Sequence, residues 1–135
     1  MRDICSIFRR LYLWVLMRVS PVKYARGIGV QVGERCKFVA ISGGTFGSEP
    51  YLISIGNHVE TSFGVNFITH DGGVWVFRDQ EPDLDVMATI QVGNNVFIGA
   101  KSIILPGANI GDDCVVGAGS VVRGEIPSGS VVAGV

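Results

Sequence analysis

The chain has 135 residues, which suffices for one domain with a continuous core but leaves no room for a separate substrate domain. Its net charge is −1 with 17% charged residues, so no basic surface for nucleic acid is expected. Three cysteines without metal-ligand spacing exclude a disulfide framework and favour a reduced, cytoplasmic protein.

The first expected element is a helix over residues 3–20, which ends before Pro21 because proline cannot continue a helix comfortably. Its apolar run, residues 11–17, is far shorter than the roughly 20 residues that cross a bilayer. Two interpretations stay open: the helix lies in an anionic membrane interface, or it caps the open edge of the next domain or a neighbouring subunit. The basic residues near it are Arg2, Arg9, Arg10, Arg18, Lys23 and Arg26.

A six-residue repeat follows, in blocks at residues 26–43, 49–72 and 86–126. In the last block an aliphatic residue leads each unit, a glycine often stands second and a small residue stands fifth. A period of six fits neither helix nor alternating strand, and it predicts a solenoid of three short strands per coil. We therefore expect an N-terminal helix or cap over residues 1–22 and a β-solenoid over residues 23–135. The leading residues are Val92, Ile98, Ile104, Ile110, Val116 and Val122.

The second-place glycines are expected at the corners of this prism, where a positive φ and a close backbone approach favour a residue without Cβ. The repeat is interrupted twice. Residues 43–49 predict a small corner loop, and residues 73–85 predict a long loop before the repeat resumes at Val86. Because loops on rigid scaffolds often carry binding residues, Trp75, Phe77 and Arg78 are candidates for substrate contacts. The alternative is that they pack on a neighbouring subunit.

The two histidines, His58 and His70, are twelve residues apart and are expected on different corners. His70 directly precedes the long loop. Imidazole changes charge near neutral pH, so His70 is the candidate general base, with Asp71 or a backbone carbonyl fixing its tautomer. The alternative is a surface histidine in a turn. Two separate histidines without a cysteine or carboxylate cluster predict no metal site.

The repeat resembles that of the hexapeptide-repeat family of left-handed parallel β-helices. The order of the motifs along the chain most closely resembles that of the maltose, galactoside and capsule-polysaccharide O-acetyltransferases. The resemblance is carried by His70 before a loop, by the coil at residues 90–99, by VGAGSVV at 116–122 and by IPSGSVVAGV at 126–135. Left-handedness is implied by the resemblance alone, since parallel crossovers are normally right-handed.

The resemblance implies direct transfer of an acetyl group from acetyl-coenzyme A (acetyl-CoA) to a sugar hydroxyl of a surface polysaccharide or its precursor. His70 would act as base, and a backbone amide of a coil would stabilise the oxyanion. It also implies a homotrimer whose cofactor arm lies between subunits, near Gly99, Ala100, Ala118 and Arg123. No metal and no nucleic acid take part, and the expected location is the cytoplasm, with contact to the inner face of the membrane as an open question.

Two alternatives remain. The first is a catalytically silent scaffold subunit, which is supported because the segment that follows Ala-Gly-Val in the family is missing after Val135. An N-acyltransferase acting on an amino-sugar nucleotide would share the fold and the histidine.

Overall fold

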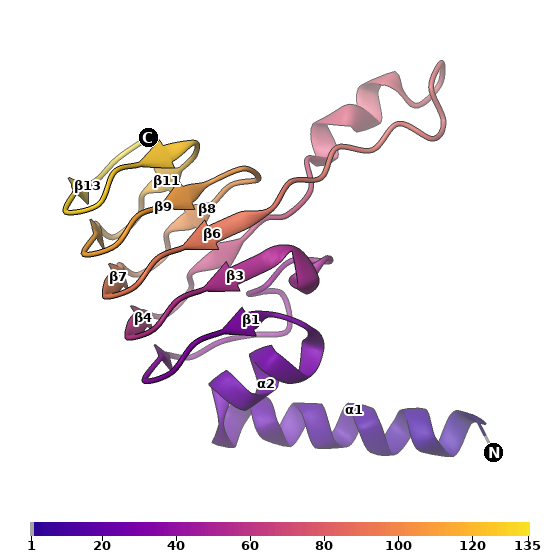
Figure 1. Ribbon diagram of the computed structural model, residues 1–135. Coiled ribbons are helices and arrows are strands. Elements are labelled where there is room, and N and C mark those ends of the chain that lie inside the picture. The colour runs from indigo at the N-terminus through magenta and orange to yellow at the C-terminus, as the bar shows by residue number, and fades with distance from the viewer. Residues whose placement is uncertain (1) are drawn as a thin grey trace.

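The chain folds into a three-sided coil of short parallel strands with helices at its N-terminal end (Figure 1). The computed structural model describes the backbone of residues 2–135 and the side chains from residue 6 onward. Each side of the prism is one parallel sheet. This architecture confirms the predicted parallel β-solenoid with an N-terminal helix.

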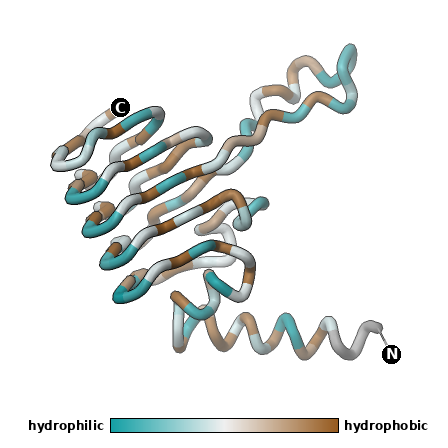
Figure 2. Tube along the Cα trace, in the orientation of Figure 1, coloured by the Kyte–Doolittle hydropathy of each residue, from teal (hydrophilic) through white to brown (hydrophobic). Residues whose placement is uncertain are grey.

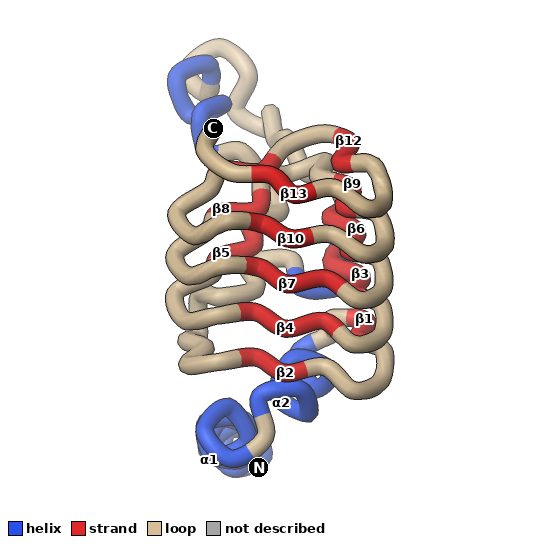
Figure 3. Tube along the Cα trace, turned by 90° about the vertical axis from the view of Figure 1, so that its left-hand side faces the viewer, coloured by secondary structure: helices blue, strands red, loops and turns tan. Residues whose placement is uncertain are grey.

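The strands follow one another around the prism, so each sheet takes one strand from each coil it spans. The first sheet contains β1 (Gln31–Val32), β3 (Ile53–Ile55), β6 (Ile90–Val92), β9 (Asn109–Ile110) and β12 (Glu125–Ile126). The second sheet, which faces the viewer in Figure 3, contains β2 (Lys37–Phe38), β4 (Val59–Thr61), β7 (Val96–Ile98), β10 (Val115–Val116) and β13 (Val131–Val132). The third sheet contains β5 (Asn66–Phe67), β8 (Ile103–Ile104) and β11 (Val121–Val122).

The strand register confirms that three hexapeptides make one coil. Phe97 pairs with Val115, and Ile103 pairs with Val121, each pair being 18 residues apart. Backbone amides of one coil donate to carbonyls of the next, and the Gly99 amide reaches the Val116 carbonyl at 2.8 Å. The stacking therefore satisfies backbone groups that would otherwise be buried without partners.

The core is a continuous column formed by the leading and fifth residues of the repeat. Ile98, Ile104 and Val116 have no exposed surface. The fifth-place residues Ser102 and Ser120 are also buried, and their hydroxyls donate to the carbonyls of Gly99 and Gly117 at 2.8 and 2.7 Å. Small polar residues are thus tolerated inside the prism because each hydroxyl has a backbone acceptor.

The repeat glycines permit close contact between coils, and the turn itself lies further along. A Cβ atom on Gly93 would lie 2.5 Å from Asp112 Oδ1 and 2.8 Å from the Gly111 carbonyl carbon. The left-handed conformation falls two residues later, at Asn95 (φ 56°) and the equivalent Asp113 (φ 57°). The expected close approach is confirmed, but the expected positive φ at the second place is wrong, because asparagine and aspartate take that conformation here.

The coil is interrupted at the two expected places. Lys37 pairs with Glu60, 23 residues away, so the small corner loop adds five residues to a coil of 18. Asn66 pairs with Ile103, 37 residues away, so the long loop adds 19. Its stem is closed by an antiparallel bridge between His70 and Met87. Val86 is 44% exposed and the core resumes at Ile90, so the repeat restarts later than expected.

Two helices precede the first coil. Helix α1 (Arg2–Val19) stops before Pro21, as predicted, and α2 (Pro21–Ile28) follows at once. Tyr24 and Ala25 of α2 are buried against the first coil, whereas α1 packs mainly on α2. The helical part therefore reaches Ile28, beyond the boundary expected at residue 22. Among the described residues, no helix has the length and apolarity needed to cross a membrane.

Candidate active site

His70 is fixed at the base of the long loop, where the third sheet ends. Strand β5 ends at Phe67, and the chain runs through Ile68 and Thr69 to His70. The Asp71 amide donates to the Val86 carbonyl at 2.8 Å, and the Ala88 amide donates to the Thr69 carbonyl at 3.0 Å. These bonds surround the His70–Met87 bridge, so the histidine is held on rigid backbone although the loop beyond it projects from the prism (Figure 1).

The carboxylate that contacts His70 belongs to Glu49, in the preceding coil. Glu49 Oε2 accepts a hydrogen bond from Thr69 Oγ1 at 2.7 Å and lies 3.4 Å from His70 Nδ1. The side chain of Glu49 is 16% exposed and that of His70 is 36% exposed. Because an ionised carboxylate only accepts, this contact favours the tautomer with the proton on Nδ1 and leaves Nε2 as the basic nitrogen.

Asp71, the expected partner of His70, has a different contact. Its Oδ1 accepts a hydrogen bond from the Gly73 amide at 2.8 Å and caps the 3₁₀ turn Gly72–Phe77. A sequence signal for Glu49 was present, because Glu49 stands in the leading place of its repeat, where other units carry an aliphatic residue. The corner loop at residues 43–49 obscured that signal by shifting the phase of the repeat.

A cavity of about 640 Å³ opens beside His70. Its walls come from the corner between the third and first sheets in successive coils: His70 and Asp71 on one coil, Leu105 and Pro106 on the next, and Arg123 beyond them. The structure thus brings together two of the residues singled out from sequence, His70 and Arg123, that are 53 positions apart. His70 and Arg123 line one cavity whose other walls are mainly apolar.

The other expected cofactor residues lie on a different corner. Gly99, Ala100 and Ala118 are in the turns between the second and third sheets, where the Gly119 amide donates to the Ala100 carbonyl at 2.8 Å. A Cβ atom on Gly99 would lie 2.5 Å from the Ala118 amide nitrogen. These residues are stacked on one another, and none of them lines the His70 cavity within a single chain.

The three loop candidates also lie away from His70. Trp75 is 73% exposed and Phe77 is 55% exposed, both in the 3₁₀ turn of the long loop. Figure 2 shows this loop projecting from the prism. Arg78 Nη2 lies 3.9 Å from Asp85 Oδ1, an ion pair within the loop. None of these three residues belongs to the cavity wall. The loop therefore presents its aromatic side chains outward rather than toward its own histidine.

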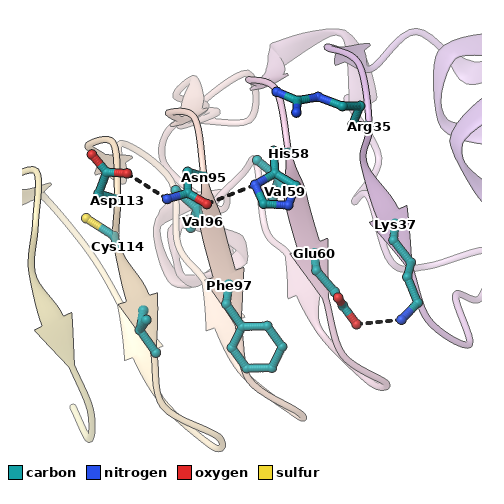
Figure 4. A pocket seen from close by; sticks show the side chains of 11 residues that line it. Arg35, Lys37, His58, Val59, Glu60, Asn95, Val96, Phe97, Asp113 and Cys114 are labelled. Atoms are coloured by element: carbon teal, nitrogen blue, oxygen red, sulfur yellow. Dashed lines mark hydrogen bonds and ion pairs between the residues drawn. The ribbon is translucent and has the colours of Figure 1, made fainter.

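A second cavity, of about 440 Å³, contains His58 on the corner between the first and second sheets (Figure 4). There His58 Nδ1 lies 2.9 Å from Asn95 Oδ1, and Asn95 Nδ2 donates to Asp113 Oδ1 at 2.6 Å. All three residues have φ between 55° and 57°. They form a ladder of equivalent turn residues whose side chains contact one another. As expected, the two histidines lie on different corners.

Within the part of the chain that the structure describes, no group of three or more histidine, cysteine, aspartate or glutamate residues could hold a metal ion. The polar groups that the structure places at the His70 cavity are an imidazole–carboxylate pair and an arginine.

The stacked hexapeptides, the histidine at the base of a loop and the cavity beside it define a class, the hexapeptide-repeat β-helix proteins. Residues 89–123 match the family described as "Hexapeptide repeat of succinyl-transferase". The structure is similar to that of a maltose O-acetyltransferase from Clostridium difficile 630, with a TM-score of 0.59, 29% identity, and coverage of 80% of this chain and 56% of that one. This similarity confirms the expected left-handed β-helix.

The chain is also similar to Protein CapG of Staphylococcus aureus, with 52% identity over 126 residues, covering 93% of this chain and 73% of that protein. With the galactoside O-acetyltransferase of Escherichia coli (strain K12) it shares 54% identity over 116 residues, covering 85% of this chain and 55% of that enzyme. The chain thus spans about half to three quarters of these relatives. It belongs to the hexapeptide-repeat acetyltransferase family, a family of acyltransferases.

Proposed function

We propose that the protein transfers an acetyl group from acetyl-CoA to a sugar hydroxyl of a surface polysaccharide or its precursor. The observation that carries this proposal is the His70–Glu49 contact at the edge of a 640 Å³ cavity shared with Arg123. The relatives support the chemical class, because two of them are named as O-acetyltransferases of galactosides and of maltose.

In the proposed reaction, Nε2 of His70 takes the proton of the acceptor hydroxyl while the hydroxyl oxygen attacks the thioester carbonyl carbon. The tetrahedral intermediate then loses the coenzyme thiolate, which receives the proton from His70, and the products are the sugar ester and the free thiol. Glu49 holds the ring through Nδ1 and stabilises the imidazolium formed in the first step. A backbone amide of a coil stabilises the oxyanion. No covalent acetyl-enzyme is needed.

A complete site requires a second copy of the chain. Gly99, Ala100 and Ala118 lie on one corner of the prism, and His70 with Arg123 lies on another, so one acetyl-CoA contacts both sets only between two copies. We propose a homotrimer, in which the Gly99 corner of each copy faces the His70 corner of the next copy, so that three copies form a closed ring. Arg123 would then contact a phosphate of the cofactor, and Trp75, Phe77 and Arg78 would contact the acceptor.

Outward side chains of the sheets support this arrangement. From the coil of β7 onward, the two sheets that meet at the Gly99 corner carry apolar residues on their outer faces, and Phe97, Val115 and Ile103 are 42%, 41% and 36% exposed. The earlier coils carry Lys37, Glu60 and Asn66 at the equivalent positions. The first sheet, which does not reach this corner, has polar residues at the outward positions. Burial of the two apolar faces against neighbouring copies removes this surface from water. The polar outward residues of the first sheet are Gln31, Ser54, Gln91, Asn109 and Glu125.

The test measures thiol release from acetyl-CoA in the presence of a panel of saccharide acceptors. We expect acceptor-dependent release by the wild-type protein, loss of at least about 100-fold in His70→Ala, and nearly full activity in His58→Ala, the matched control on the other corner. If coenzyme A does not bind the purified protein, the scaffold alternative is supported. If amino sugars react only at nitrogen, the N-acyltransferase alternative is supported. Equal activity of His70→Ala and wild type would refute the role of the base.

A further inference from the structure

Helix α1 is attached to the protein by one face only. Its half-buried residues Leu13, Leu16 and Met17 pack against the core cluster that includes Tyr24 and Ala25 of α2. The other apolar side chains of α1 that the structure describes point away from the protein and are 43–77% exposed. They are Ile7, Phe8, Leu11, Tyr12, Trp14, Val15 and Val19. An apolar surface of this size on a single helix calls for a partner.

The exposed residues form a continuous stripe along the helix. Ile7, Leu11 and Trp14 follow one another at spacings of four and three residues, in a row that Arg18 continues. An adjacent row at the same spacings consists of Phe8, Tyr12, Val15 and Val19, so both rows lie on one side of the α-helix. Helix α1 has 18 residues and is therefore about 27 Å long at about 1.5 Å per residue. In both Figure 1 and Figure 3, α1 is the outermost element at the N-terminal end of the solenoid and crosses the direction in which the coils stack. A flat surface can therefore contact the stripe along its length without meeting the coils or the long loop.

The N-terminal end of the chain, which contains α1, is positively charged, whereas the rest of the chain is negatively charged. Residues 1–26 contain six basic side chains and one acidic side chain, whereas residues 27–135 contain five basic and eleven acidic ones. Arg9, Arg10 and Arg18 are exposed on α1, and the Arg18 guanidinium lies 4.5 Å from the centre of the Trp14 ring. Arg26 contacts Glu34 at 2.9 Å and is engaged by the first coil. Arg2 lies outside the described side chains.

We propose that α1 binds an anionic lipid bilayer by lying in its interface, with the stripe toward the acyl chains and the arginines at the phosphates. Tryptophan and tyrosine prefer this depth of the bilayer, and an apolar face bordered by arginines is typical of interfacial helices. A second copy docked end to end would bring two positively charged helices together, which repel each other. The long loop at residues 73–85 projects away from α1 (Figure 1).

The experiment measures cosedimentation of the full chain with vesicles, without any substrate. Vesicles of phosphatidylcholine with about 30% phosphatidylglycerol are compared with vesicles of phosphatidylcholine alone, at low and high salt. We expect binding to the anionic vesicles that weakens with salt. The variant Arg9→Gln/Arg10→Gln should bind about thirtyfold more weakly, because each basic residue near an anionic surface contributes a factor of about five. Leu11→Asp/Val15→Asp should lose binding, while Val76→Asp, at a still more exposed apolar position on the long loop, should keep it.

Fluorescence of Trp14, measured in a Trp75→Phe background, identifies the occupant of the stripe. A blue shift that appears only with anionic vesicles supports the proposal. The proposal is overturned if the variant Leu11→Asp/Val15→Asp binds vesicles as the wild type does, or if wild type fails to sediment with them. It is also overturned if Trp14 emission is already blue-shifted without vesicles and Leu11→Asp/Val15→Asp dissociates the oligomer, since a second copy then covers the stripe. Transferase activity enters none of these outcomes, so they are independent of the proposed reaction.

Discussion

Replacement of Glu49 by glutamine tests whether this residue, rather than Asp71, supports His70. Glutamine has nearly the same shape and can still accept from Thr69, so the change removes mainly the negative charge at 3.4 Å from Nδ1. Two unit charges at this distance interact by about 5 kcal/mol at an effective dielectric constant of about 20, and by about 1 kcal/mol in water. The two side chains are 16% and 36% exposed, which places the interaction in the lower half of that range.

We therefore expect Glu49→Gln to lose about 1.4 to 2.7 kcal/mol of transition-state stabilisation, which corresponds to a 10- to 100-fold decrease in kcat/KM at about 1.4 kcal/mol per factor of ten. Steady-state thiol release at saturating acetyl-CoA measures it, and thermal unfolding verifies that the fold is intact. Asp71→Asn is the matched control, because asparagine can still cap the 3₁₀ turn through the Gly73 amide. It should stay within about twofold of wild type. Full activity in Glu49→Gln, or equal losses in both variants, would refute the assignment of Glu49 as the positioning carboxylate.

Three further predictions concern stability and assembly. Ile98→Ala should lower the free energy of unfolding by about 2–5 kcal/mol, because the Ile98 side chain is fully buried in the column. Urea unfolding measures this, and a midpoint no lower than that of Phe97→Ala would contradict the assignment of Ile98 to the core and Phe97 to the outer face. Gly93→Ala should lower the melting temperature more than Gly119→Ala. A Cβ at Gly93 meets backbone atoms of the next coil, whereas a Cβ at Gly119 meets nothing within 4 Å and adds only the strain of φ 70°. If Gly119→Ala lowers the melting temperature more, the explanation by close contact between coils is wrong. An inactive His70→Ala chain mixed with an inactive Ala118→Trp chain should recover part of the activity in mixed trimers, because some sites then combine two intact corners, and Ala118 is exposed so that the larger side chain fits the fold. No recovery after verified subunit exchange would argue against a shared site.

The sequence by itself determined the scaffold. A six-residue period with leading aliphatic residues such as Ile98 and Ile104 has few solutions, because only a three-sided coil turns every leading side chain inward and pairs every backbone amide with the next coil. The same periodicity exposed the two interruptions, and the position of His70 before the longer one indicated the candidate base. These conclusions depend on local pattern, which a linear sequence displays directly.

Only the tertiary structure decided which groups meet. Glu49 reaches His70 because a corner loop of five extra residues moves it next to the following coil, a shift that hid it from the periodic pattern. Arg123 joins the cavity because it lies on the second coil after that of His70, with one coil between the two, whereas Gly99 and Ala118 fall on another corner. The structure likewise showed that α1 packs on α2 through one face and leaves most of its described apolar side chains exposed. Side chains from different coils become neighbours because the coils stack. Which side chains meet depends on the number of residues in each coil, and a loop changes that number without changing the hexapeptide repeat.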